Sequence, residues 1–219
     1  MRAVAWVVCV AAALVVVVRP GAARAQAPDV AWPTAQAAEL TRQGRAHEAR
    51  GDRDQAQRRY LEAIELDGSY GAAYLALGEL HERGGDPREG ERVYAVGIDH
   101  ISGFADGYLA RARLRMRQRR FEDAASDLGA ASSIRPDDLA VLEALLGARV
   151  AMSALPAALA VARRLEAAAR AAGNETLAAE TRVRARALAR LVGEADPVTA
   201  AAVGRGALRA ALARHAEKR

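Results

Sequence analysis

Cysteine, lysine and aromatic residues are all scarce in this chain. Cys9 is the only cysteine and Lys218 the only lysine among 219 residues, while aromatic residues make up 4% and none follows Phe121. With a single cysteine the protein can form no internal disulfide, so its stability must come from packing. Alanine supplies much of the 52% hydrophobic content, and alanine favours helices but buries little area. The composition therefore predicts many thin helices rather than a thick aromatic core.

Strand patterns and catalytic motifs are missing as well. No run shows sustained alternation of β-branched residues, so we predict an all-α fold. The sequence has no glycine-rich phosphate loop and no G-x-S-x-G motif, and its one cysteine lies in the N-terminal apolar run. These absences predict a protein that is not an enzyme and that binds no cofactor.

Two histidines begin a zinc motif that the sequence does not complete. His47-Glu48 and His81-Glu82 match the first half of H-E-x-x-H, but glycine stands four residues after each histidine. We therefore predict no metal site. The weakest alternative is an enzyme accessory protein in which the two histidines share a metal ion.

Residues 1–25 have the layout of a secretory signal peptide. Arg2 precedes an uninterrupted apolar run from Ala3 to Val18, and a helix-breaking Pro20-Gly21 comes before Ala23-Arg24-Ala25. A membrane span needs about 20 apolar residues, more than this run supplies. We therefore expect export, with the periplasm of a bacterial envelope as first choice. Secretion, or retention by an uncleaved N-terminal anchor, is the alternative.

Charge is divided unevenly along the chain. Removal of residues 1–25 leaves 29 basic against 27 acidic side chains, which gives little reason to expect nucleic acid binding. Residues 26–138 carry 16 basic against 20 acidic side chains, whereas residues 139–219 carry 13 against 7. The basic C-terminal segment suggests an alternative function, peripheral contact with an anionic membrane surface or polymer. A solvated arginine-rich face is the simpler interpretation.

From Ala37 onward the same residue types recur with a fixed period. Two positions of each unit are large, three are small, and the unit ends in a turn-forming residue. The large residues are Leu40, Tyr74, Tyr108 and then Tyr60, Tyr94, Leu128; the small ones are Gly44, Gly78, Ala112, then Ala56, Gly90, Ala124 and Ala63, Gly97, Ala131; the ends are Gly68, Ser102 and Pro136. A fixed period of this size, about 34 residues, is typical of stacked helical hairpins, none of which can bury its apolar face alone.

These units resemble tetratricopeptide repeats (TPRs), a family that has the same period. The third unit carries the resemblance most clearly, in Tyr108-Leu109-Ala110-Arg111-Ala112, Arg120-Phe121-Glu122-Asp123-Ala124 and Ile134-Arg135-Pro136-Asp137-Asp138. The resemblance implies an all-α, TPR-type α-solenoid with three clear repeats, at residues 37–70, 71–104 and 105–138. An irregular linker containing Pro28 and Pro33 is expected before them, at residues 26–36. Glycine at positions 90 and 97, where the family has alanine, suggests a loosely packed array.

The pattern weakens after residue 138. Residues 139–172 are predicted to form a degenerate fourth hairpin, in which Leu142, Ala158 and Ala162 keep the register. Residues 173–219 are predicted to form alanine- and arginine-rich C-terminal helices that cap the array, at about 175–192 and 197–216. Asn174 matches a glycosylation acceptor, but it opens a helix, and an N-cap explains it more simply.

The resemblance also implies a binding groove on the first helices of the hairpins. In this family these helices line a concave groove that binds a peptide or helix of another protein. The corresponding groove residues here are Arg42, Arg45, Glu79, Arg113 and Arg117. Arg113 and Arg117 are the best candidates to hold a carboxylate, whereas Arg111 is expected to bond Asp127 on the paired helix. The sequence therefore predicts a non-enzymatic scaffold or adaptor of the cell envelope that binds a protein or peptide partner.

Overall fold

The structure is a computed structural model that describes residues 32–194. The predicted signal peptide, most of the predicted linker and the helix predicted at 197–216 lie outside the described residues. Within them the chain forms nine α-helices and no strand, which confirms the all-α prediction. The helices are α1 (Trp32–Ala49), α2 (Arg53–Leu66), α3 (Gly71–Arg83), α4 (Pro87–His100), α5 (Ala105–Arg117), α6 (Phe121–Ile134), α7 (Leu139–Ala151), α8 (Leu155–Ala171) and α9 (Glu175–Glu194).

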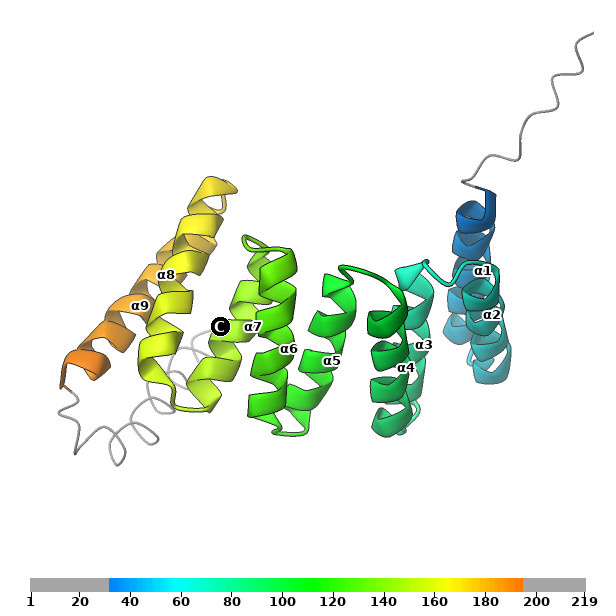
Figure 1. The fold of residues 1–219 in the computed structure, drawn as a ribbon, viewed down its shortest axis with the longest axis horizontal. Helices are drawn as coiled ribbons and strands as arrows, with labels where there is room; N and C mark the ends of the chain where they lie inside the picture. Colours follow the sequence, from blue (N-terminus) through cyan, green and yellow to red (C-terminus); the bar gives the residue numbers. More distant parts are fainter. Residues whose placement is uncertain (1–31, 195–219) are drawn as a thin grey trace, which may run out of the picture. The chain divides into compact units, whose positions relative to one another are not determined.

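The helices pair into four hairpins that follow one another in chain order (Figure 1). The first helices contact each other in succession, α1 with α3, α3 with α5 and α5 with α7. Each second helix also contacts the first helix of the next hairpin, and α9 packs against α8. The first helices α1, α3, α5 and α7 therefore form one continuous layer of a solenoid.

The turns inside the hairpins repeat as well. Gly51, Gly85, Arg119 and Ser153 follow one another at the repeat period, and their φ angles are 84°, 83°, 64° and 58°. This left-handed conformation suits glycine because glycine has no Cβ, whereas other residues pay about 1–2 kcal/mol for it. The fourth hairpin thus keeps the period of the others, although its sequence pattern is weak.

The start of α1 differs from the prediction. Residues 32–36 were predicted to be irregular because of Pro33, but α1 begins at Trp32. Proline is tolerated in the first helical turn, since the N–H that it lacks has no acceptor there. The hydroxyl of Thr34 donates to Asp67 at the end of α2, at 2.7 Å, and so ties this first turn to the paired helix.

Three helix starts follow from their capping residues. Asp86 accepts a hydrogen bond from the Glu89 N–H at 3.0 Å, and Pro87 fills the first turn of α4. The Asn174 side chain accepts from the Leu177 N–H at 3.1 Å, which confirms Asn174 as the N-cap of α9. Asp138 caps α7 in the same way, through the N–H groups of Ala140 and Val141.

The core contains aromatic side chains at its N-terminal end and mainly aliphatic side chains after it. A cluster at the N-terminal end contains the aromatic side chains Tyr60, Tyr74 and Phe104. A larger cluster, from Ala105 to Leu188, consists of alanine, leucine and valine. Leu142, Ala158 and Ala162 are fully buried in it, which confirms the predicted register of the fourth hairpin.

The α3–α4 hairpin is tightly packed, contrary to the expectation of a loose array. A Cβ built on Gly90 would lie 2.9 Å from the carbonyl oxygen of Gly78, inside any normal contact distance. Glycine at position 90 therefore brings the two helices closer together than alanine would allow.

Candidate functional site

A tyrosine, a glutamate and an arginine join the first two hairpins. The ring of Tyr60 on α2 lies so close to α1 that a Cβ on Gly44 would be 2.4 Å from its Cε1 atom. The Tyr60 hydroxyl donates to Glu48 on α1 at 3.0 Å. Arg83 on α3 forms an ion pair with the same glutamate at 2.5 Å. We call this set of three residues the first clasp.

The same arrangement recurs between the second and third hairpins. The Tyr94 ring lies over Gly78, where a Cβ would be 2.2 Å from Cε1, and the Tyr94 hydroxyl donates to Glu82 at 2.7 Å. Arg117 on α5 forms an ion pair with Glu82. Tyr94, Glu82 and Arg117 form the second clasp, one period after the first.

Burial raises the pKa of both clasp tyrosines. It is the main reason why the pKa of Tyr60 is raised, and the hydrogen bond to Glu48 raises it further. Burial likewise raises the pKa of Tyr94, with the nearby charge of Glu79 adding to the effect. Both hydroxyls therefore carry a proton to donate to their glutamates at neutral pH.

The third hairpin has no clasp. Met116, Leu128 and Ala151 stand where glutamate, tyrosine and arginine would continue the period, and Ala112 replaces the glycine. Ala112 and Leu128 are both fully buried in the aliphatic cluster. The clasps therefore end at Arg117 on α5.

The clasps border a hollow of about 320 Å³ lined by Glu79, Glu82, Arg83 and Arg117. These four residues belong to the first helices α3 and α5. Arg83 lies between two carboxylates, because it also approaches Glu79 at 3.6 Å. The hollow therefore has no net charge, and most of its charges already have partners.

The predicted groove residues fall into two groups. Glu79 and Arg117 both line the hollow. Arg42 pairs with Glu39 on its own helix. Arg45 and Arg113 are exposed, and neither forms an ion pair within residues 32–194. Burial raises the pKa of Tyr60, and the charge of Arg45 offsets part of that rise, so Arg45 lies near the first clasp.

The sequence interpretation missed Glu48, Glu82 and Arg83. Glu48 and Glu82 do occupy equivalent positions one period apart, and so do Tyr60 and Tyr94. The recurrence of both residue types was the sequence feature that could have indicated a repeated glutamate–tyrosine contact.

A second set of ion pairs joins α4, α5 and α6. Arg111 donates twice to the buried Asp127, at 2.9 and 2.7 Å, which confirms the predicted bond. Arg115 bridges Asp127 and Glu91, each at 2.8 Å, and Arg120 reaches Glu91 at 2.7 Å. Burial raises the pKa of Glu91, but the hydrogen bonds from Arg120 and Arg115 together outweigh burial and leave that pKa lowered. These arginines are engaged within the fold.

The histidines do not gather into a metal site in the described part of the chain. His47 Nδ1 lies 3.7 Å from an Asp52 carboxylate oxygen, in the turn after α1. Residues 32–194 contain no group of three histidine, cysteine, aspartate or glutamate side chains that could hold a metal ion.

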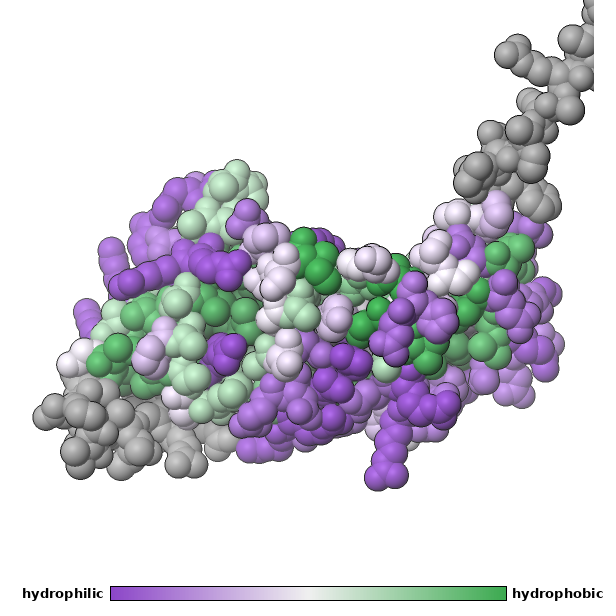
Figure 2. Space-filling model, viewed as in Figure 1, coloured by the Kyte–Doolittle hydropathy of each residue, from purple (hydrophilic) through white to green (hydrophobic). Residues whose placement is uncertain are grey.

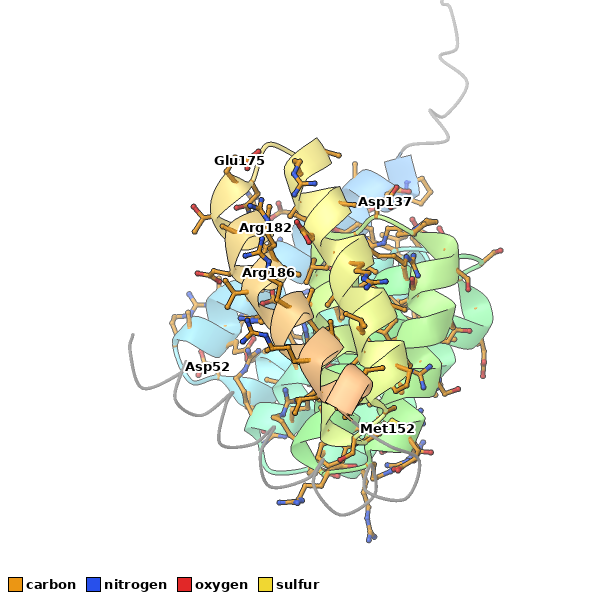
Figure 3. All side chains as sticks on the ribbon, turned by 90° about the vertical axis from the view of Figure 1, so that its left-hand side faces the viewer. Asp52, Asp137, Met152, Glu175, Arg182 and Arg186 are labelled. Carbon is orange, nitrogen blue, oxygen red and sulfur yellow. The ribbon has the colours of Figure 1, made fainter. Side chains whose placement is uncertain are left out.

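The basic C-terminal segment includes a row of arginines along α9. Arg182, Arg186 and Arg190 are four residues apart and therefore lie on one side of the helix; Arg182 and Arg186 are labelled on α9 in Figure 3. Arg182 donates to Glu166 on α8 at 3.0 Å, whereas Arg186 and Arg190 are exposed. None of the helices between residues 32 and 194 is long and apolar enough to cross a membrane.

Solved structures of other proteins share this architecture. The PilF protein of Pseudomonas aeruginosa aligns with 19% identity and a TM-score of 0.50, over 68% of this chain and 74% of its own. The MamA protein aligns with 14% identity and a TM-score of 0.50, over 74% of this chain and 97% of its own. The first TPR domain of human RPAP3 aligns with 16% identity and a TM-score of 0.48, over 56% and 95%.

No protein-family model matches the sequence, and no curated protein matches it. The structural likeness therefore concerns the fold alone. The fixed repeat period, the four stacked hairpins and the continuous layer of first helices agree with that likeness. The protein has the fold of an all-α, TPR-type solenoid.

Proposed function

We propose that the protein is a non-enzymatic scaffold that binds a segment of another protein across the layer formed by α1, α3 and α5. One observation carries this proposal: the layer has a polar hollow, and two exposed arginines without ion pairs in the described residues, Arg45 and Arg113, lie on the helices to either side of α3. Charged side chains without internal partners can be engaged by a ligand at little cost.

The proposed location is the bacterial cell envelope, most directly the periplasm. This part rests on the signal-peptide layout of residues 1–25. Because Cys9 lies in that segment, the exported protein would need no oxidative folding step.

A capture experiment with matched variants tests the groove. Residues 26–219 carrying Arg45→Glu and Arg113→Glu should lose a partner that the unchanged protein captures from the envelope fraction. The control carries Arg58→Glu and Arg88→Glu, which make the same change in charge at exposed sites on the second helices α2 and α4. If the groove variant keeps every partner, or both variants lose the same ones, the proposal is wrong.

Arg117→Glu is a poor choice for this experiment. Arg117 pairs with Glu82, whose side chain is 15% exposed, so a glutamate there would place two carboxylates against each other. A loss of binding would then report a damaged fold.

A second candidate function is attachment to an anionic membrane surface or polymer through the basic C-terminal helices. The exposed Arg186 and Arg190 on one side of α9 favour it. Arg186→Glu with Arg190→Glu should abolish flotation with anionic liposomes while leaving the buried side of α9 intact. Unchanged flotation would exclude a role for this face of α9.

A further inference from the structure

The groove offers a register of alternating charge. Arg45, Glu79 and Arg113 occupy the same position in three successive first helices, each one repeat period after the last. Because α1 contacts α3 and α3 contacts α5, these positions follow one another across the layer. The order along the groove is therefore positive, negative, positive.

These three charges are the ones that the clasps leave available. Arg83 and Arg117 neutralise Glu48 and Glu82, and the two tyrosine hydroxyls complete the hydrogen bonding of those carboxylates. Glu79, by contrast, has only a long contact of 3.6 Å with Arg83, and its side chain is 55% exposed. Arg45 and Arg113 are exposed as well.

The alternation disfavours ligands of one sign relative to a ligand of alternating charge. An acidic segment would be repelled by Glu79 at the centre, and a basic segment would be repelled by the arginines at both ends. Like charges brought together in this way reduce affinity and reject wrong partners. The complementary ligand carries an acidic, a basic and an acidic side chain in that order.

The spacing fits a polyproline II backbone. Packed helices lie about 8–10 Å apart, so neighbouring positions of the register differ by about one such step. A polyproline II helix rises about 3.1 Å per residue and has three residues per turn, so every third side chain points the same way at steps of about 9 Å. A β-strand does not fit, because its side chains alternate and residues three apart point to opposite faces.

We infer that the groove binds a linear protein segment in the polyproline II conformation with an acidic residue at position i, a basic residue at i+3 and an acidic residue at i+6. This inference rests on the proposed function. The basic residue would lie against Glu79 in the hollow, and the acidic residues would lie against Arg45 and Arg113.

Short synthetic peptides test this inference. The probe is fluorescein-labelled Asp-Pro-Pro-Arg-Pro-Pro-Asp, compared by fluorescence anisotropy with the charge-inverted Arg-Pro-Pro-Asp-Pro-Pro-Arg and with Asp-Arg-Pro-Pro-Pro-Pro-Asp, in which the register is shifted. With residues 26–219 at low ionic strength, the probe should bind at least about tenfold tighter than the inverted peptide, because exposed ion pairs are individually weak but three change sign together. The preference should shrink as salt is added.

A charge exchange ties the preference to the groove. Arg113→Glu should weaken binding of the probe and favour Asp-Pro-Pro-Arg-Pro-Pro-Arg instead, whereas Arg88→Glu on α4 should change neither affinity. Equal binding of all peptides, a variant that does not change its preference, or the same loss with Arg88→Glu would each overturn the inference.

The peptide experiment and the capture experiment fail separately. If the Arg45→Glu/Arg113→Glu variant loses its partner but the peptides bind alike, the groove is a binding surface and the inferred ligand is wrong. If that variant keeps every partner, the proposed function itself is wrong.

Discussion

In the first two hairpins a tyrosine ring lies over a glycine, whereas the third hairpin has Leu128 and Ala112 at the same positions. The tyrosines carry hydroxyls that bind Glu48 and Glu82, and these glutamates in turn hold an arginine of the next hairpin. The aliphatic version buries its side chains and makes no such contact.

The difference shows that one solenoid can combine a charged surface in one part with an aliphatic core in another. The hairpins from α1 to α4 use clasps that place charged groups on the first-helix layer, next to the hollow. The hairpins from α5 to α8 belong to the continuous aliphatic cluster. In Figure 2, the visible surface of α7 and α8 is paler and more apolar than the hydrophilic surface at the joined ends of α5 and α6. We propose that α1, α3 and α5 carry recognition, and that the aliphatic cluster of α5 to α8 contributes stability.

The largest effect is expected where the two halves meet. Asp127→Ala should destabilise the protein by about 3–4 kcal/mol, since it leaves the partly buried Arg111 and Arg115 without their shared carboxylate. Urea denaturation measures the change. Asp123→Ala, on the exposed side of the same helix, is the control and should cost less than about 0.5 kcal/mol. Equal costs for the two variants would show that the buried ion pairs contribute no more than an exposed one.

Replacing the glycine–tyrosine packing with the alanine–leucine packing should give the next largest change in stability. Gly78→Ala should cost about 2–3 kcal/mol, because the new Cβ would overlap the fully buried ring of Tyr94. Adding Tyr94→Leu reproduces the pair found at Ala112 and Leu128. The double variant should be more stable than Gly78→Ala alone, and costs that simply add would refute the equivalence of the two arrangements.

Removing only the hydroxyls probes the clasps themselves. Tyr60→Phe and Tyr94→Phe should each cost about 1 kcal/mol, the usual value of one hydrogen bond. Tyr70→Phe serves as the control, and thermal denaturation of all three variants makes the comparison. If the first two variants unfold at the same temperature as the control, the clasps do not stabilise the stack.

The smallest effects concern the hairpin turns. Gly85→Ala has room for its Cβ but keeps a φ of 83°, so it should cost about 1 kcal/mol. Ser153→Gly should gain no more than about 1 kcal/mol, because relief of the left-handed conformation is partly offset by the entropy of glycine. Thermal denaturation of both variants measures these changes. A stabilising Gly85→Ala would mean that the shared turn conformation is not a constraint.

Much of this architecture could be predicted from the sequence, because it depends on the repeat period and on residues within one hairpin. The repeat period placed the hairpins, Asn174 marked the start of α9, and Arg111 could be paired with Asp127. Pro33 was wrongly interpreted as a sign of irregular structure. Proline interrupts a helix when it lies in the interior but is tolerated in the first turn. The expectation that Gly90 loosens the packing was also wrong, since the absence of a side chain can allow two helices to approach each other more closely.

The clasps could not be predicted, because they depend on how one hairpin lies against the next. Arg83 and Arg117 each belong to the hairpin that follows the one holding their glutamate, Glu48 or Glu82. Only the stacking of the first helices determines which of several exposed arginines reaches each glutamate. The sequence showed the repeat of residue types but not the contacts between repeats.

Site-specific photo-crosslinking in cells tests the central claim, that α1, α3 and α5 carry the recognition surface, most directly. A photoreactive amino acid replaces Arg45 or Arg113 in the groove, Arg58 or Arg88 on the second helices, and Arg186 on α9, one position at a time in the full chain. The account predicts that both groove positions yield the same crosslinked partner and that Arg58 and Arg88 yield none. Adducts confined to Arg58, Arg88 or Arg186 would contradict it.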